Sequence, residues 1–296
     1  MTRASSWSAS LAAVITTAAL GAPAAAQTQD VLVSAGLNVR MISGTFGSDQ
    51  TTRLVYAPVV LRLDFGRDEL SGYFPFLTID NGTVAFSEGG LVPMRGSLTN
   101  APIVGVPMQG GSGTMMGQHG SSISGGVVGL MTHQSGFGDV VGTVGFRAID
   151  NPLSGLQLVL GARVKIPTAA AERGLGTGRA DIAGVVIVRK RLINGWIYAE
   201  GGYLVPGSLP DVDLNRAVVW GIGGGRRIGC RLYLLASASG NSPLVSQFGA
   251  PVEIGAGLGV RLRDRVNLTV LPTVGLSDAS PNYALTFGFS SELVRR

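Results

Sequence analysis

The segment 252–263, with the sequence VEIGAGLGVRLR, alternates between apolar residues and small or charged ones. Its apolar residues take every second position: Val252, Ile254, Ala256, Leu258, Val260 and Leu262. Because a strand sends successive side chains to opposite faces, one face of this segment would be apolar throughout. The alternation outlasts the roughly five or six residues typical of globular strands. It reaches the length that a tilted strand needs to cross hydrocarbon, and therefore predicts a membrane-crossing strand.

The same pattern recurs along most of the chain. Eleven further segments show it, at 31–42, 53–65, 69–79, 140–148, 156–166, 181–190, 195–205, 216–226, 231–239, 266–274 and 283–293. The total of twelve is even, as in bacterial single-chain barrels. Short connections, such as 66–68 and 263–265, alternate with long ones, such as 80–139 and 277–282. The pattern predicts an all-β fold, an antiparallel transmembrane β-barrel of about 12 strands with short periplasmic turns and long extracellular loops.

A closed barrel explains this distribution better than a soluble β-sandwich, which is the main alternative. In lipid every backbone N–H and C=O must be paired within the protein, so a sheet has to close on itself. A soluble sandwich would carry many lysines and glutamates on its outward face, whereas this polar face holds mainly Gly, Ser and Thr with a few Arg. The mean hydropathy is +0.34, and 45 of the 296 residues are glycine, about twice the average usage.

The N-terminal residues 1–26 have the features of a secretory signal peptide. Arg3 precedes an apolar run, LAAVITTAALGAPAA, and small alanines precede Gln27. We expect cleavage after Ala26 and export of residues 27–296 to the cell outer membrane, as a barrel with a long loop at about 80–139. The single cysteine, Cys230, excludes an intrachain disulfide framework. Basic residues are scattered rather than clustered, so no nucleic-acid partner is expected.

Four stretches, taken in order, resemble one known family. They are GYFPFLTID at 72–80, GFGDVVGTVGFR at 136–147, VKIPT with GLGTGRAD within 164–181, and VGLSDASPNYALTFGF at 274–289. Together they are similar to the outer-membrane transporter family named for the meta-pathway of phenol degradation. The resemblance implies a small-solute channel or importer, with no catalytic residues to carry over. Such a barrel would have outer-membrane lipids, a small-molecule solute and the barrel-insertion machinery as its partners.

Charged residues on the strands are the main candidates for function. If the aliphatic face of each strand contacts lipid, the charges on the opposite face line the lumen. An excess of arginine there would favour anionic solutes, aromatic carboxylates among them, because charged linings set pore selectivity. The alternative is that these charges form ion pairs that brace a narrow or plugged barrel. The expected lumen-lining residues are Arg40, Arg62, Arg147, Arg163, Lys165, Arg189, Arg231, Arg261, Asp64, Glu200, Glu253 and Glu292.

The stretch THQSGFGD, at 132–139, suggests a different chemistry. His133 and Ser135 are two residues apart and would share one face of a strand, which is how a histidine base can serve a serine nucleophile. Outer-membrane phospholipase A and lipid A deacylases use such a His-x-Ser pair on a lipid-facing strand, with Asn directly after Ser. Gly136 stands at that position here. The group that orients the histidine is therefore open, and Asp139 or a residue of another strand could supply it.

The favoured hypothesis is an outer-membrane channel or transporter for small solutes, which is not an enzyme and has neither cofactor nor metal. GLGTGRAD, at 174–181, superficially resembles a phosphate-binding glycine loop, but it lies between two alternating strands rather than before a helix. Two alternatives stay open. One is a lipid-active outer-membrane hydrolase that uses His133 and Ser135, and the other is a structural barrel with a closed lumen.

Overall fold

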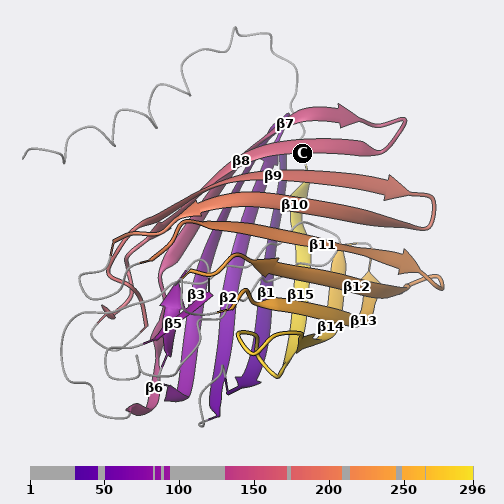
Figure 1. The fold of residues 1–296 in the computed structure, drawn as a ribbon. Coiled ribbons are helices and arrows are strands. Elements are labelled where there is room, and N and C mark those ends of the chain that lie inside the picture. The colour runs from indigo at the N-terminus through magenta and orange to yellow at the C-terminus, as the bar shows by residue number, and fades with distance from the viewer. Residues whose placement is uncertain are drawn as a thin grey trace, which may run out of the picture.

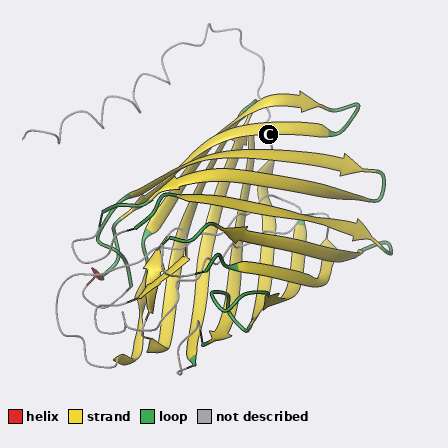
Figure 2. Ribbon diagram, viewed as in Figure 1, coloured by secondary structure: helices red, strands yellow, loops and turns green. Residues whose placement is uncertain are grey.

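The chain folds into strands that close one antiparallel sheet. A computed structural model describes residues 31–45, 51–82, 84–87, 90–93, 131–171, 175–208, 214–244, 249–263 and 265–295. The first seven strands are β1 (Val31–Gly44), β2 (Thr52–Phe65), β3 (Asp68–Gly82), β4 (Val84–Ser87), β5 (Gly90–Pro93), β6 (Met131–Phe137) and β7 (Val140–Asn151). The remaining strands are β8 (Leu156–Ile166), β9 (Asp181–Leu192), β10 (Gly195–Val205), β11 (Ala217–Arg227), β12 (Leu232–Asn241), β13 (Val252–Arg263), β14 (Val266–Gly275) and β15 (Tyr283–Arg295). Figure 2 shows that strands and their connections make up almost all of this part of the chain.

One sheet contains thirteen of these strands, and it closes into a ring (Figure 1). Strands pair with their neighbours in sequence from β7 to β15, β15 pairs with β1, and β1, β2 and β3 complete the ring. β6 pairs with β3 over residues 76–82, whereas β7 pairs with β3 over residues 68–73. Since β6 and β7 share one place beside β3, the ring has twelve positions, thirteen strands less one. The predicted all-β antiparallel barrel of about twelve strands is therefore confirmed.

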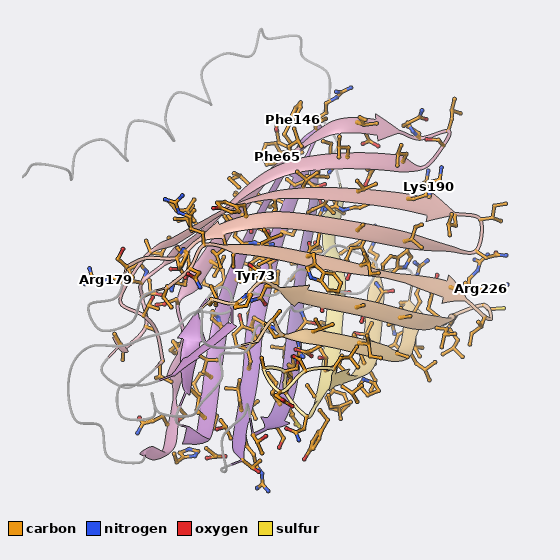
Figure 3. The ribbon with its side chains drawn as sticks, in the orientation of Figure 1. Phe65, Tyr73, Phe146, Arg179, Lys190 and Arg226 are labelled. Carbon is orange, nitrogen blue, oxygen red and sulfur yellow. The ribbon has the colours of Figure 1, made fainter. Side chains whose placement is uncertain are left out.

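The two ends of the barrel differ in their connections. The short-turn end carries the turns after β2, β7, β9, β11 and β13, together with the first and last described residues. The long-loop end carries the connections after β1, β3, β8, β10, β12 and β14. Lys190 and Arg226 lie at the short-turn end, and Arg179 lies at the opposite end (Figure 3). This is the alternation of short and long connections that the sequence predicts.

Burial follows the period of two along the strands. In β2, every second residue from Thr52 to Asp64 is buried, and the residues between them are half-buried or exposed. The buried set faces the inside of the ring. The outward set is largely apolar, as Leu61 on β2 and Phe74 on β3 show with 46% and 43% exposure. An exposed apolar belt of this kind is what a barrel presents to hydrocarbon. Within the described residues, no helix is long and apolar enough to span a membrane.

The fourth strand of the ring starts earlier than its sequence pattern suggests. The alternation predicts it from residue 140, but β6 adds residues 131–137 to the same position in the ring. The two pieces are separated at Gly138 and Asp139. Gly138 donates its N–H to the carbonyl oxygen of Pro75 at 2.9 Å, and a Cβ there would lie 2.8 Å from Cδ1 of Leu77. Glycine lets the chain pass this close to β3.

Strands extend into the expected long loop of about 80–139 from both of its ends. β3 continues to Gly82, β4 and β5 form a separate hairpin, and β6 takes up residues 131–137. The middle of that loop, 94–130, and the expected signal peptide, 1–26, lie outside the described residues.

Candidate functional site: the barrel interior

The inside of the barrel has two walls of different character. On β1, β2, β3, β7, β8 and β9 most inward side chains are large and buried, and we call this region the packed wall. On β11 and β13 the inward positions are mostly glycine, and together with β10, β12, β14 and β15 they form the glycine wall. Its inward glycines on those two strands are Gly221, Gly223, Gly225, Gly255, Gly257 and Gly259. Along the length of the barrel, one side of the interior is therefore filled by large side chains, and the other side has room beside its glycines.

A buried charge cluster lies at the long-loop end of the packed wall, and we call it the Lys165 cluster. Lys165 Nζ lies 2.7 Å from Asp181 Oδ2 and 3.5 Å from Asp139 Oδ2, and all three side chains are buried. Lys165 also donates to Thr177 Oγ1 at 2.5 Å. Asp139 accepts hydrogen bonds from the backbone N–H groups of Ala169 and Thr177, at 2.9 and 3.3 Å. A buried charge is costly unless it is paired and hydrogen-bonded, and here partners from three chain segments supply those bonds.

The described residues of the connection between β8 and β9, 167–171 and 175–180, reach into the barrel, and we call them the inward loop. Leu175 is 1% exposed and packs with inward residues of four strands: Ile42 of β1, Leu54 and Tyr56 of β2, Leu77 and Ile79 of β3, and Ala284 of β15. A Cβ on Gly176 would lie 2.6 Å from Asp139 Oδ1, so glycine is needed where the loop meets that carboxylate. The inward loop thus narrows the interior at the long-loop end, with the Lys165 cluster as its anchor.

Glu69 is the centre of a second network, at the short-turn end of the packed wall. Arg147 Nε and Arg189 Nη1 both donate to Glu69 Oε1, at 2.7 and 2.8 Å, and Arg62 Nη2 lies 3.0 Å from Glu69 Oε2. Asp64 accepts two hydrogen bonds from Arg62, at 2.7 and 2.8 Å, and one from Arg147 at 2.7 Å. Three arginines thus share two carboxylates, and this part of the interior is braced by ion pairs as the alternative hypothesis expects.

Arg40 and Glu253 form a separate ion pair across the inside of the ring. Arg40 lies on β1 and Glu253 on β13, with β15 and β14 between them in the ring. Both side chains are 3% exposed, and Glu253 Oε2 also accepts a hydrogen bond from Thr273 Oγ1 at 3.2 Å. This pair ties the edge of the packed wall to the glycine wall.

Arg163 and Glu200 are buried in the interior near the Glu69 network. The positive charges of Arg163 and Arg189 attract the Glu200 carboxylate. Nε of Arg163 and Oε2 of Glu200 are buried and have no hydrogen-bond partner within the described part of the chain. Buried polar atoms are nearly always hydrogen-bonded, so each of these two atoms is a place where a water molecule would bind.

A cavity of about 560 Å³ lies at the short-turn end, between the two walls. Asp150, which lies 3.6 Å from Arg147, is the carboxylate among its lining residues. Within the described residues, no carboxylate lies within ion-pair distance of Arg227 or Arg261. The basic lining residues are Arg189, Lys190, Arg191, Arg227 and Arg261, and the aromatic ones are Trp196, Tyr198 and Tyr233. The mouth of the barrel at this end is therefore positively charged and partly aromatic.

The aromatic side chains of this cavity lie flat over glycines. Trp196 and Tyr198 on β10 are stacked with ring centroids 5.9 Å apart, and each stands directly opposite a glycine of β11, Gly225 and Gly223. A Cβ on Gly223 would lie 2.8 Å from Cε1 of Tyr198. The glycines thus let the rings rest against the wall instead of projecting into the interior. Across the cavity, the Arg261 guanidinium lies 5.7 Å from the centre of the Tyr233 ring.

Two of the expected lining residues lie near the rim of the short-turn end. Arg231 is exposed in the turn before β12 and donates to the carbonyl oxygen of Leu262 at 3.4 Å. Glu292 is half-buried on β15, opposite Ser34 of β1. The other ten belong to the clusters and the cavity described above. A lining role for all twelve stays a prediction.

His133 and Ser135 lie on β6 at the long-loop end, away from these clusters. His133 stands opposite Asp80 of β3, and Ser135 stands opposite Thr78. Asp80 and Thr78 alternate with the buried inward residues Leu77 and Ile79, so the pair is on the outward face of the barrel. Asp139 does not orient His133, because its carboxylate is buried inside and bound to the inward loop.

Three structural roles were not assigned from the sequence: Glu69 as the centre of a network, Asp139 as the anchor of a loop, and Leu175 as its inserted side chain. A signal was available for two of them. Three of the motifs that carry the family resemblance come together in space. GFGD contributes Asp139, VKIPT contributes Lys165, and GLGTGRAD contributes Leu175, Thr177 and Asp181. These motifs therefore build the inward loop and its anchor. Among the described residues, no group of His, Cys, Asp and Glu side chains is placed to hold a metal ion.

Comparison with known proteins supports the fold. No protein-family model and no curated protein sequence matches the chain. Among solved structures, the NanC porin is similar over 87% of this chain and 100% of its own, with 9% sequence identity and a TM-score of 0.50. The CymD monoaromatic hydrocarbon channel matches 90% of this chain and 89% of its own, with 8% identity and a TM-score of 0.41. The Ralstonia pickettii toluene transporter TbuX matches 90% of both chains, with 9% identity and a TM-score of 0.41.

These identities are too low to carry a function from one protein to another. The likeness to the NanC porin shows the fold alone. Membership of the family named for the meta-pathway of phenol degradation stays a prediction from the motifs. The chain is a closed twelve-position antiparallel barrel that resembles the outer-membrane porins.

Proposed function

We propose that the chain is an outer-membrane channel for small solutes and that it prefers anions, aromatic carboxylates among them. The observation that carries this proposal is the cavity at the short-turn end, where Arg227 and Arg261 lie beside Trp196, Tyr198 and Tyr233. A guanidinium attracts a carboxylate, and an aromatic face accepts a stacked ring. The family resemblance also favours a channel for small solutes.

The proposed path follows the glycine wall. The packed wall is filled by buried side chains and by the inward loop, so a solute would pass beside β11 and β13, where most inward residues are glycine. At the short-turn end it would meet the basic cavity. A charged lining of one sign raises the local concentration of oppositely charged solutes, which gives selectivity without a tight binding site.

In this proposal the short-turn end faces the periplasm and the long-loop end faces outward, as in outer-membrane barrels generally. Residues 1–26 are a signal peptide that is cleaved after Ala26. Mass spectrometry of protein purified from the outer membrane should find Gln27 at the N-terminus. A mature protein that still begins at Met1 would contradict the signal-peptide part of the proposal and leave the channel part untouched.

Planar-bilayer recordings test the channel. The protein lacking residues 1–26 is refolded in detergent, inserted and placed in a gradient of potassium chloride. We expect discrete conductance steps and a reversal potential on the chloride side, and we expect benzoate to lower the chloride current at lower concentration than acetate does. A reversal potential on the potassium side would contradict the anion preference. A folded barrel without conductance would support the structural barrel with a closed lumen.

A further inference from the structure

An aspartate–histidine contact lies on the outer surface of the barrel, remote from the proposed channel. Nδ1 of His133 on β6 lies 2.5 Å from Oδ1 of Asp80 on β3. The two residues are direct cross-strand partners in the ladder between these strands. Because Nδ1 is held by the carboxylate, the imidazole is fixed in one orientation with Nε2 pointing away from Asp80. The side chains of His133 and Asp80 are 60% and 45% exposed, so a reactant can reach them.

Ser135 shares the outward face of β6 with His133. Residues two apart on a strand point to the same side. The register confirms the face, because Ser135 stands opposite Thr78 and His133 stands opposite Asp80, while Ile79 between them is 5% exposed and faces the interior. Asp80 orients His133, and Ser135 lies two residues along the same outward face of β6, so the three residues have the composition of a hydrolytic triad.

The surroundings indicate what such a site would act on. Continuing down the same outward face, Phe137 of β6 and Phe76 of β3 pack edge to face with ring centroids 5.6 Å apart. Both are exposed, 74% and 42%, as is Phe74 further along β3. Aromatic rings on the outer face of a barrel mark the boundary between headgroups and acyl chains. Asp80, His133 and Ser135 lie beyond this aromatic surface, toward the long-loop end, which is the side on which such a boundary would place lipid headgroups.

We propose that Asp80, His133 and Ser135 form a lipid-facing hydrolytic site that cleaves acyl esters of membrane lipids. This activity goes beyond the proposed channel and uses none of its interior residues. Asp80 supplies the orienting group that THQSGFGD lacks. It comes from GYFPFLTID, 53 residues earlier in the sequence, which is why the local motif looks incomplete.

The proposed reaction has two balanced steps. Ser135 Oγ attacks the ester carbonyl carbon while its proton passes to Nε2 of His133, and the ester C–O bond breaks as that proton is delivered to the leaving alcohol. A water molecule then attacks the acyl-serine, again losing its proton to His133, and fatty acid and free Ser135 are released with the proton returned to Oγ. Asp80 is a positioning residue, which holds the imidazole and stabilises its transient positive charge.

Two measurements on the purified, refolded protein test this site. The first is covalent labelling with a fluorophosphonate, followed by mass spectrometry of the peptide that contains residue 135. The second is release of fatty acid from phosphatidylethanolamine vesicles. We expect labelling at Ser135 and ester cleavage, with both lost in Ser135→Ala and His133→Ala. The matched controls are Ser208→Ala and Asp278→Asn, which alter exposed residues at the same end of the barrel and should leave both readouts unchanged.

The role of Asp80 is tested by measuring kcat and KM separately, because a residue that only supports the fold would not lower kcat alone. We expect Asp80→Asn to lower kcat by about 10²–10⁴-fold with little change in KM. The substitution removes the carboxylate that positions the base His133, and it leaves lipid binding intact. Asp80→Glu should recover part of that loss. If wild-type protein that shows normal channel conductance neither labels at Ser135 nor releases fatty acid, the hydrolytic site is refuted while the channel stands. Conductance should also be unchanged in Ser135→Ala, so that failure of either proposal is recognised separately.

Discussion

The packed wall and the glycine wall are parts of the same sheet, yet they use their inward positions in opposite ways. On the packed wall, inward residues such as Tyr56 and Leu77 are fully buried, and charges such as Lys165 are completely paired. On the glycine wall, Gly223 and Gly225 carry no side chain, and the rings of neighbouring β10 lie over them. One wall is built like the core of a soluble protein, and the other keeps two strands almost without inward side chains.

This difference shows how a small barrel can be stable and still keep internal space. In a ring of twelve strands, the same inward side chains that hold the barrel together also decide how much internal space is left. Concentrating most ion pairs and apolar packing on one side leaves more room on the other side, beside β11 and β13. The inward loop then docks on the packed side, where Leu175 finds apolar partners and Lys165 finds carboxylates. Changes on the two walls should therefore have different effects.

Replacing Lys165 by methionine should have the largest effect on the packed wall. Asp139 and Asp181 would keep their buried positions without the cation between them, and breaking a buried ion pair costs about 3–5 kcal/mol. We expect the free energy of unfolding, measured by urea titration in lipid vesicles, to fall by about that amount. Conductance should rise, because the inward loop loses its anchor. Arg226→Met, which alters an exposed cation on the outward face at the short-turn end, is the control and should change neither quantity appreciably.

Replacing Leu175 by alanine should open the inward loop with a smaller loss of stability. The side chain is fully buried among residues of four strands, and Leu→Ala at such a site costs about 2–5 kcal/mol, with the lower half of that range expected for a loop that can relax. Single-channel conductance should increase. If it stays at the wild-type value while stability falls, Leu175 is only packing and the inward loop does not limit the passage.

Replacing Gly223 by alanine tests the glycine wall. The new methyl group would stand 2.8 Å from Cε1 of Tyr198, so the ring must leave the wall and enter the interior. We expect destabilisation of about 1–3 kcal/mol, lower conductance and an altered fluorescence of Trp196, which is stacked on Tyr198. Gly201→Ala is the matched control, because a methyl group there meets nothing within 4 Å. Equal effects of the two substitutions would contradict the distinction between inward and outward glycines.

Replacing Arg227 by glutamine should give the smallest effect, on selectivity alone. Arg227 borders the cavity, whereas its neighbour Arg226 faces outward. We expect the reversal potential of Arg227→Gln to move toward the potassium side by a measurable amount, with stability within about 0.5 kcal/mol of wild type. Arg226→Gln should leave the reversal potential unchanged. A shift of the same size in both variants would assign the selectivity to net charge instead of the cavity.

The strands were predictable because the sequence itself shows apolar residues alternating with small or polar ones at a period of two. For β13 the predicted and observed bounds agree, 252–263 in both cases. The pattern is weaker where both faces are apolar, as on β3, where Phe74 and Phe76 point outward while Leu77 and Ile79 point inward. There the sequence cannot say which face is inside, and Glu69 is not recognised as an inward residue.

The interior arrangement was not predictable, because it depends on the register between strands and on closure of the ring. Lys165, Asp139 and Asp181 are on different segments, and only the pairing of β7 with β8 and of β8 with β9 brings them together. Leu175 is one apolar residue in a glycine-rich connection, which reads as an exposed loop until its partners across the barrel are known. In the same way, the link between His133 and Asp80 follows from the register of β6 on β3.

The position of Leu175 also links the inward loop to closure of the ring. Its partners include Ile42 and Ala284, which belong to the first and last strands of the ring, and these strands meet where the sheet closes. The pocket that receives Leu175 is complete only when β15 has paired with β1. Full burial of Leu175 therefore requires a closed ring, which makes this side chain a reporter of whether the seam between β15 and β1 has formed.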